Sequence, residues 1–234
     1  MAFIGATVFL GTGRLDGMSN LIPFDVDKWS RREHFHHYRQ VVPCTYSMCV
    51  ELDATDFVEE LRKTSWKTYI AQIWAIATIV NRHHEFRMAL TEDGQLGVWG
   101  EVHPSFTIFN RVQETFSSVW VPYDTDFSLF HAAAASAIRE YSGGTTLFPQ
   151  GSPPSNLFDV SSIPWASFTG FNLNVVGVTD HFAPIFTLGR YIEKHGQTIL
   201  PLAVQVHHAV VDGFHVARLV DELQALIRDS RWLH

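Results

Sequence analysis

Apolar and polar residues follow two different periods along the chain, and together they predict a fold that mixes helices and strands. Helical spacing and helix propensity predict three long helices, over residues 69–80, 127–141 and 216–227. Strand-forming residues, in several places alternating with polar ones, predict strands over residues 45–52, 97–102, 106–110, 171–178 and 200–207. Asp53 follows the first strand and is predicted to cap a helix that buries Phe57, Val58 and Leu61.

The order of these elements predicts an α/β fold, a two-layer sandwich in which helices pack on a mixed β-sheet. Some strands are joined by short turns and others by helices, so both antiparallel and parallel pairs are expected. No repeat or charged linker divides the chain, and the Pro-, Gly- and Ser-rich residues 148–155 fit a loop inside one domain. We therefore expect a single domain over residues 18–234. Residues 1–17, which end just before Met18, indicate an extra N-terminal leader.

Composition limits the partners and the compartment. The chain has 234 residues, 46% of them apolar, which is enough for a substantial core. Its net charge of −7 offers no basic surface for nucleic acid. The apolar residues 2–10 are too few for the roughly 20 that cross a bilayer, so we expect no membrane partner. Cys44 and Cys49 are the only cysteines, which fits a reducing cytoplasm.

Titratable side chains gather where the last predicted strand meets the last helix. Residues 207–213 follow the pattern His-His-x-x-x-Asp-Gly. A sheet can hold such side chains rigidly at a strand end, and histidine titrates near neutral pH, so a base here could take a proton from a hydroxyl. The alternative is a metal site made of His207, His208, Asp212 and His215. Adjacent histidines at a strand end point to opposite faces, which disfavours one shared ion, so we expect no metal.

The pattern His-His-x-x-x-Asp-Gly is the signature of CoA-dependent acyltransferases, and the rest of the chain resembles the chloramphenicol acetyltransferase family in particular. Five further blocks match that family in the same order: Trp29-Ser30-Arg31-Arg32-Glu33-His34-Phe35, Leu147-Phe148-Pro149-Gln150-Gly151, Ile163-Pro164-Trp165, Phe171-Asn172-Leu173-Asn174 and Phe182-Ala183-Pro184. The resemblance covers residues 23–226. It implies the CoA-dependent acyltransferase fold and transfer of an acetyl group from acetyl-CoA to a hydroxyl of chloramphenicol, which inactivates the antibiotic. Acetyl-CoA would be a co-substrate, with no tightly bound cofactor.

The same resemblance implies roles for individual residues. His208 would be the general base, Ser161 would stabilise the oxyanion and Thr187 would assist through water. Asp212 either orients the histidine directly or supports the site through a salt bridge to Arg31, and the resemblance favours the salt bridge. Acceptor binding is implied for six residues: Tyr38, Cys44, Phe116, Phe148, Phe171 and Leu173. Contacts with CoA are implied for Trp165 and Tyr191.

The resemblance further implies a homotrimer in which neighbouring subunits share each active site. His36 and His37 depart from the family beside Tyr38, which leaves the fit of the acceptor open. Two rival functions are a catalytically silent protein that binds an aromatic ligand, and acyl transfer to a lipoyl group. Turnover with acetyl-CoA distinguishes the first rival, and dihydrolipoamide as acceptor distinguishes the second.

Overall fold

The computed structural model describes residues 20–173 and 179–234. The predicted leader, residues 1–17, lies outside the described residues. Most of the strands join one large sheet: β2 (Thr45–Asp53), β5 (His103–Asn110), β6 (Thr115–Trp120), β7 (Leu157–Ile163), β8 (Ile185–Gly189), β9 (Ile192–Lys194) and β10 (Gln197–His207). The predicted strands over residues 45–52, 106–110 and 200–207 are confirmed as β2, β5 and β10.

The large sheet is mixed, as predicted. Over the described ranges it has seven strands in the order β2-β10-β8-β7-β5-β6, with β9 paired to β10. β7 runs parallel to both β5 and β8. β10 is antiparallel to β2, β8 and β9, and β5 is antiparallel to β6. The parallel centre of the sheet brings residues that are far apart in sequence side by side.

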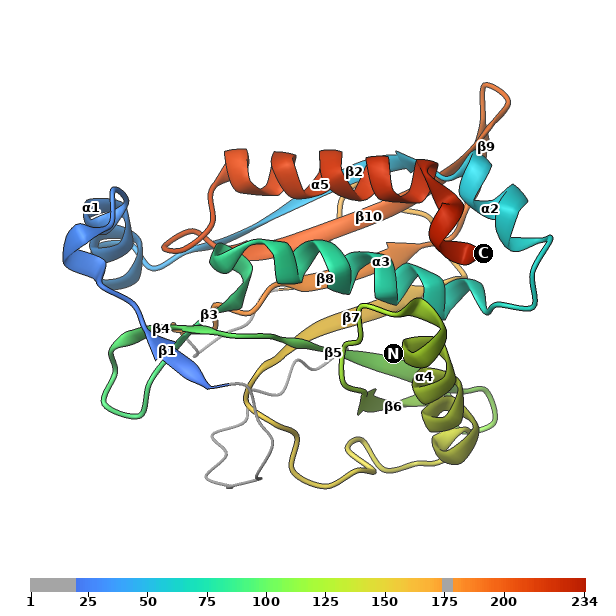
Figure 1. Cartoon of the computed structure of the whole chain (residues 1–234), viewed down its shortest axis with the longest axis horizontal. Helices are drawn as coiled ribbons and strands as arrows, with labels where there is room; N and C mark the ends of the chain where they lie inside the picture. The colour runs from blue at the N-terminus through green and yellow to red at the C-terminus, as the bar shows by residue number, and fades with distance from the viewer. Residues whose placement is uncertain (1–19, 174–178) are drawn as a thin grey trace.

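Three long helices pack against this sheet (Figure 1). The α-helices are α1 (Arg32–His36), α2 (Thr55–Leu61), α3 (Thr68–Arg82), α4 (Phe127–Tyr141) and α5 (Gly213–Arg228). Shorter helical turns are η1 (Val26–Lys28), the π-helix η2 (His37–Val41), η3 (His84–Arg87) and η4 (Ser230–Leu233). Figure 1 shows α3 between α5 and α4, and it contacts both. The predicted α/β sandwich and its three long helices are therefore confirmed.

The core lies between the sheet and these helices. Phe106, Val160, Phe186 and Val204 form a row across four neighbouring strands through their pairing. Each is at most 1% exposed, and the ring of Tyr69 in α3 meets Phe106 edge to face at 6.2 Å. Burying one such side chain stabilises the fold by about 1.5–3 kcal/mol. The row therefore identifies the face of the sheet that the helices cover.

Polar residues occupy the alternate positions of the same strands. Ser105, Asp159 and Gln205 belong to one row, and Ser161 and Thr187 to the next. Because successive side chains of a strand point to opposite faces, these residues point away from the helices. The helix-free face of the sheet is therefore the polar face.

The predicted strand over residues 97–102 is only partly correct. β4 (Leu96–Trp99) ends early and belongs to a separate sheet of three strands in the described chain, ordered β1-β4-β3 with β1 (Leu21–Pro23) and β3 (Met88–Leu90). Arg87 donates hydrogen bonds to the carbonyl oxygens of Trp99 and Gly100. These carbonyls are satisfied by a guanidinium, so the strand does not continue.

The predicted strand over residues 171–178 is wrong for residues 171–173, which are irregular. The Phe171 N–H donates to Cys49 Sγ at 3.1 Å, and the Leu173 N–H donates to Gln205 Oε1 at 2.8 Å. Both backbone donors are bound by side chains of the polar face and not by a neighbouring strand. Residues 174–178 lie outside the described residues.

The predicted cap at Asp53 is displaced by one residue. α2 begins at Thr55 with Ala54 at its N-cap, and Asp53 ends β2. The Asp53 carboxylate still accepts hydrogen bonds from the Thr55 N–H at 3.1 Å and from its hydroxyl at 2.6 Å. Phe57 and Leu61 are buried, and Val58 is half-buried. Across the described chain, every helix is too short or too polar to cross a membrane.

Candidate active site

The backbone of His208 is held at the end of β10 by two other elements. Its N–H donates to the carbonyl oxygen of Cys44 at 3.0 Å, just before β2 begins. Its own carbonyl oxygen accepts a hydrogen bond from Arg31 Nη2 at 3.3 Å, just before α1. The histidine therefore lies where the sheet edge meets the first helix.

The ring of His208 is fixed by aromatic contacts. Tyr38 stacks on it with ring centroids 3.9 Å apart and an angle of 21° between the planes. Tyr46 meets it edge to face at 5.4 Å. Nδ1 lies 3.4 Å from the carbonyl oxygen of Val211. When Nδ1–H donates to that carbonyl, Nε2 carries the lone pair that can accept a proton.

Tyr46 was not selected from the sequence. It pairs with Val206 across β2 and β10, and this places its ring beside the end of β10. Burial and the negative charge of Asp212 raise the pKa of Tyr46, although Arg31 acts in the opposite direction. The hydroxyl therefore stays protonated at neutral pH. Only the pairing register could have identified it, because strand neighbours are set by tertiary contacts.

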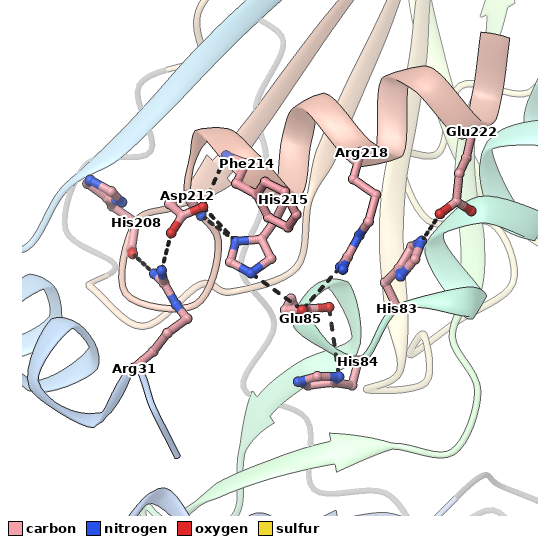
Figure 2. A network of polar contacts seen from close by, with 10 residues as sticks. All are labelled: Arg31, His83, His84, Glu85, His208, Asp212, Phe214, His215, Arg218 and Glu222. Carbon is pink, nitrogen blue, oxygen red and sulfur yellow. Dashed lines mark hydrogen bonds and ion pairs between the residues drawn. The ribbon is translucent and has the colours of Figure 1, made fainter.

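Asp212 supports the loop after His208 (Figure 2). Its carboxylate accepts the N–H of Phe214 at 3.1 Å as the N-cap of α5, and it forms a salt bridge with Arg31. Burial tends to raise the pKa of Asp212, but Arg31, His215 and the backbone N–H donors outweigh it and lower the pKa. Figure 2 shows that the contacts of Asp212 lead to Arg31, Phe214 and His215, whereas His208 joins the network through its carbonyl oxygen.

Ser161 and Thr187 form the second part of the candidate site. They pair across the parallel strands β7 and β8, and their hydroxyl oxygens lie 3.0 Å apart. Both side chains are buried on the polar face. Thr187 also pairs with Ala203, and His208 lies five positions further along the chain (203 to 208). At about 3.4 Å per residue, one chain therefore keeps His208 about 17 Å from Thr187.

The four residues of the alternative metal site do not converge. His207 Nε2–H donates to the carbonyl oxygen of Thr179 at 2.8 Å, and its Nδ1 accepts the N–H of Ala209 at 3.1 Å. Burial lowers the pKa of His207, which keeps the ring neutral. Within the described ranges, no group of three or more His, Cys, Asp and Glu side chains could hold a metal ion.

The implied acceptor residues fall into separate groups within one chain. Tyr38 and Cys44 lie beside His208. Phe171 and Leu173 are bound to the polar face near Cys49 and Gln205, and the Phe171 ring contacts Phe168 at 5.3 Å. Phe116 pairs with Phe109 at the β6 edge. Phe148 is half-buried in the loop after α4, next to the contact between Leu147 and Ser118 of β6.

The spacing of the strands shows how far apart these groups are. Phe116 lies on β6, five strand spacings from β2, which Cys44 directly precedes. At about 4.8 Å per spacing, the two ends of the sheet are about 24 Å apart. One chain therefore does not bring all the implied acceptor residues together. Burial raises the pKa of the Cys44 thiol, which keeps it protonated.

The two residues implied in CoA binding differ in exposure. Trp165 is 50% exposed and its ring meets Phe109 at 4.5 Å. Tyr191 is half-buried, and its hydroxyl accepts a hydrogen bond from Gln72 Nε2 at 2.7 Å. Burial, opposed by that hydrogen bond, raises the pKa of Tyr191 to about 12. Trp165 is thus open to solvent, whereas Tyr191 is partly enclosed and bound to Gln72.

Comparisons with known proteins identify the family of the chain. The sequence model of the chloramphenicol acetyltransferase family matches residues 19–224. A chloramphenicol acetyltransferase of Streptomyces acrimycini is 57% identical over 90% of this chain and 96% of its own length. Chloramphenicol acetyltransferase 3 of Escherichia coli is 45% identical over 88% of this chain and 97% of its own. A solved chloramphenicol acetyltransferase, 21% identical, shares the fold with a TM-score of 0.75 over 89% of this chain and 99% of its own. The chain belongs to the chloramphenicol acetyltransferase family.

Proposed function

We propose that this protein transfers the acetyl group of acetyl-CoA to a hydroxyl of chloramphenicol, with His208 as the general base. Membership of the family supports the two substrates. One observation carries the assignment of the base: the His208 ring is stacked under Tyr38 with Nδ1 facing the Val211 carbonyl oxygen. This arrangement leaves Nε2 as the proton acceptor.

In this mechanism His208 Nε2 takes the proton of the acceptor hydroxyl while its oxygen adds to the thioester carbonyl carbon. The carbonyl π electrons move to its oxygen, and a tetrahedral oxyanion forms. When the oxyanion collapses, the carbon–sulfur bond breaks, and the protonated His208 returns its proton to the departing thiolate. General-base assistance of this kind is worth about 10²–10⁴ in rate. The face of Tyr38 stabilises the imidazolium that forms between the two steps.

Ser161 is proposed to donate its hydroxyl proton to the oxyanion. Its oxygen lies 3.0 Å from the Thr187 hydroxyl, and either group can be the donor of that bond. When Thr187 donates to Ser161, the Ser161 proton is free to point at the substrate. Thr187 thereby orients the donor, and it is also proposed to assist through a water. A preorganised donor of this type is worth roughly 10²–10³ in kcat.

Asp212 is proposed to support the site and not to touch the substrate. Its carboxylate holds Arg31, and Arg31 in turn donates to the carbonyl oxygen of His208. The ion pair thus keeps the loop in place under the catalytic ring. The proposed acceptor pocket comprises Tyr38, Cys44, Phe116, Phe148, Phe171 and Leu173, and CoA is proposed to pack on Trp165 and Tyr191. Aromatic and aliphatic side chains suit the nitrophenyl ring of the drug.

The site is proposed to be shared between neighbouring subunits of a homotrimer. Within one chain, His208 lies about 17 Å from Thr187, the neighbour of Ser161. This is too far for His208 to reach the acceptor hydroxyl while Ser161 binds the oxyanion of the same tetrahedral intermediate. The acceptor residues are similarly divided between the two ends of the sheet. A second copy that presents its polar face to His208 would complete the site.

Release of thiol from acetyl-CoA, with and without chloramphenicol, tests the reaction. We expect drug-dependent release by the parent and a loss of about 10²–10⁴ in kcat for His208→Ala, with the fold and oligomeric state of the variant verified. Dihydrolipoamide serves as a competing acceptor. No release with chloramphenicol would refute the acceptor, and a His208→Ala variant with the parent's kcat would refute the base.

Mixing two inactive variants tests the shared site. His208→Ala and Ser161→Ala chains are refolded together in equal amounts. If neighbouring chains supply the two residues, about one quarter of the sites combine an intact His208 with an intact Ser161, and activity returns to about that fraction of the parent. Each variant refolded alone is the control. Mixtures no more active than the separate variants would show that each chain supplies both residues to its own site.

A further inference from the structure

A second carboxylate, Glu85, lies behind the loop that follows His208 (Figure 2). It is in the short helix η3, which follows α3, and its side chain is only 8% exposed. Arg218 Nη2 donates to Glu85 Oε1 at 3.1 Å. The same oxygen lies 3.4 Å from Nε2 of His215. A buried carboxylate thus faces two groups in the first turns of α5.

His215 connects this carboxylate to Asp212. Its Nδ1 accepts the backbone N–H of Asp212 at 3.1 Å and closes a capping box at the start of α5. The same Nδ1 lies 2.8 Å from the carboxylate oxygen Oδ1 of Asp212. A neutral imidazole has one donor and one acceptor nitrogen. While Nδ1 accepts the Asp212 N–H, the proton is on Nε2, which points at Glu85. A proton on Nδ1 would instead face Asp212 Oδ1 and would break the capping-box bond. The capping box therefore requires one tautomer of His215, and Glu85 is the acceptor that stabilises this tautomer.

The charges around His215 are consistent with a neutral ring. Burial lowers the pKa of His215, Asp212 and Glu85 oppose this effect, and Arg31 and Arg218 add to it. Burial tends to raise the pKa of Glu85, but its own backbone N–H together with His84, Arg218 and His215 lowers the pKa overall. Glu85 is therefore ionised beside a neutral imidazole at neutral pH.

We propose that Glu85 is a positioning residue for the active site: its carboxylate holds the proton of His215 on Nε2, so that Nδ1 can bind the Asp212 N–H. Asp212 fixed in this way holds Arg31, which holds the carbonyl oxygen of His208. Loss of Glu85 allows the proton to move to Nδ1, where it donates to Asp212 Oδ1 and Nδ1 no longer accepts the Asp212 N–H. The effect on catalysis rests on the function proposed above, whereas the tautomer of His215 does not depend on it.

Helix α5 contains a residue for a control variant, Glu222. Glu222 of α5 lies 2.9 Å from His83 Nε2 and 3.3 Å from Arg82 Nη1, so it also joins a histidine and an arginine. Figure 2 shows this pair further along α5, away from Asp212. Glu222→Leu removes a carboxylate with the same two kinds of partner, although its side chain is 31% exposed against 8% for Glu85, without breaking the path to His208.

The kinetic test compares Glu85→Leu, Glu85→Gln and Glu222→Leu in the parent and in a His215→Gln background. Glutamine at this position completes a capping box without any proton from Glu85. In the parent we expect Glu85→Leu to lower kcat about tenfold with KM for both substrates nearly unchanged, the size of coupling seen between contacting residues. Glu85→Gln keeps an acceptor oxygen and should retain more kcat, and Glu222→Leu should leave kcat unchanged. In the His215→Gln background the effect of Glu85→Leu should disappear. An equal fall in both backgrounds, or the same fall in Glu222→Leu, would overturn the proposal.

A measurement of the tautomer needs no substrate. In protein labelled with ¹⁵N at the imidazole nitrogens, the His215 signals, assigned by their loss in His215→Gln, should show a protonated Nε2 and an unprotonated Nδ1. Glu85→Leu should move them toward the other tautomer. Unchanged His215 signals in Glu85→Leu would overturn the proposal even if the protein acetylates chloramphenicol. A changed tautomer in a protein that does not acetylate the drug would instead contradict only the proposed function.

Discussion

Replacing Asp212 by asparagine tests whether this carboxylate supports the site or acts directly on His208, the proposed general base. Asparagine keeps the size of the side chain and one oxygen that can accept the Phe214 N–H, but it removes the charge that pairs with Arg31. Loss of activity alone cannot separate the two roles, because both require the carboxylate. The discriminating quantities are therefore stability and the dependence of the effect on Arg31.

The expected loss of stability follows from the exposure of the two partners. The side chain of Arg31 is 12% exposed and that of Asp212 is 30% exposed. Removing one partner of a buried ion pair lowers the free energy of unfolding by about 3–5 kcal/mol. Because solvent reaches Asp212, we expect a loss near the lower end of this range, about 3 kcal/mol. Asparagine is about as good an N-cap as aspartate, whereas alanine loses about 1 kcal/mol more. We expect losses of about 3 kcal/mol for Asp212→Asn and about 4 kcal/mol for Asp212→Ala.

The assay combines urea denaturation at a fixed protein concentration with the kcat of thiol release. It uses Asp212→Asn, Arg31→Met and the double variant. If Asp212 acts only through Arg31, kcat of the double variant equals that of the less active single variant, because either substitution alone already breaks the contact from Asp212 through Arg31 to His208. Asp212→Asn lowering kcat as much in the Arg31→Met background as in the parent would refute this reasoning. So would a large loss of kcat with no loss of stability, since it would indicate direct action on His208.

Three other predictions concern different parts of the molecule. Ser161→Ala should lower kcat by roughly 10²–10³ with little change in KM, measured by initial rates; an unchanged kcat would exclude Ser161 as the oxyanion donor. Gly189→Ala should destabilise the fold by about 1–3 kcal/mol, because an added Cβ would lie 3.0 Å from Pro201 Cβ and 3.1 Å from Phe168 Cε1. Denaturation curves that match the parent would contradict this. Burial lowers the pKa of five described histidines, among them His207 and His215. Fewer described carboxyl groups act in the opposite direction, namely Asp159 and Glu101, whose pKa burial raises. Below about pH 6.5 the unfolded chain therefore binds more protons than the folded chain. The free energy of unfolding should then fall on acidification, by up to about 1.4 kcal/mol per pH unit for each histidine. The fall for each histidine ends once the pH is below its folded-state pKa. Urea denaturation at several pH values measures this slope, and stability that rises between about pH 6.5 and about pH 5.5 would show that the sign is wrong.

Some elements carry a complete local signal and others do not. α4 (Phe127–Tyr141) matches its predicted range because helix propensity and the start at Asp126 lie within one short segment. β7 and β8 were not predicted, although Phe158, Asp159, Val160 and Ser161 alternate as a strand of a half-buried sheet should. β8 is buried on both faces, so its residues do not alternate. Ser161 and Thr187 were therefore identified by resemblance and not by pattern.

The order of residues along the chain was enough to predict the three long helices, the strand that leads into His-His-x-x-x-Asp-Gly, and the family to which the chain belongs. These features depend on periodicity and on residue order, which survive without knowledge of neighbours. The tertiary structure decided which side chains meet: Tyr38 with His208, Ser161 with Thr187, and Glu85 with His215. It also places His208 about 17 Å from Thr187 within one chain. Such contacts depend on strand register and on the packing of distant segments, and no single stretch of sequence encodes either one.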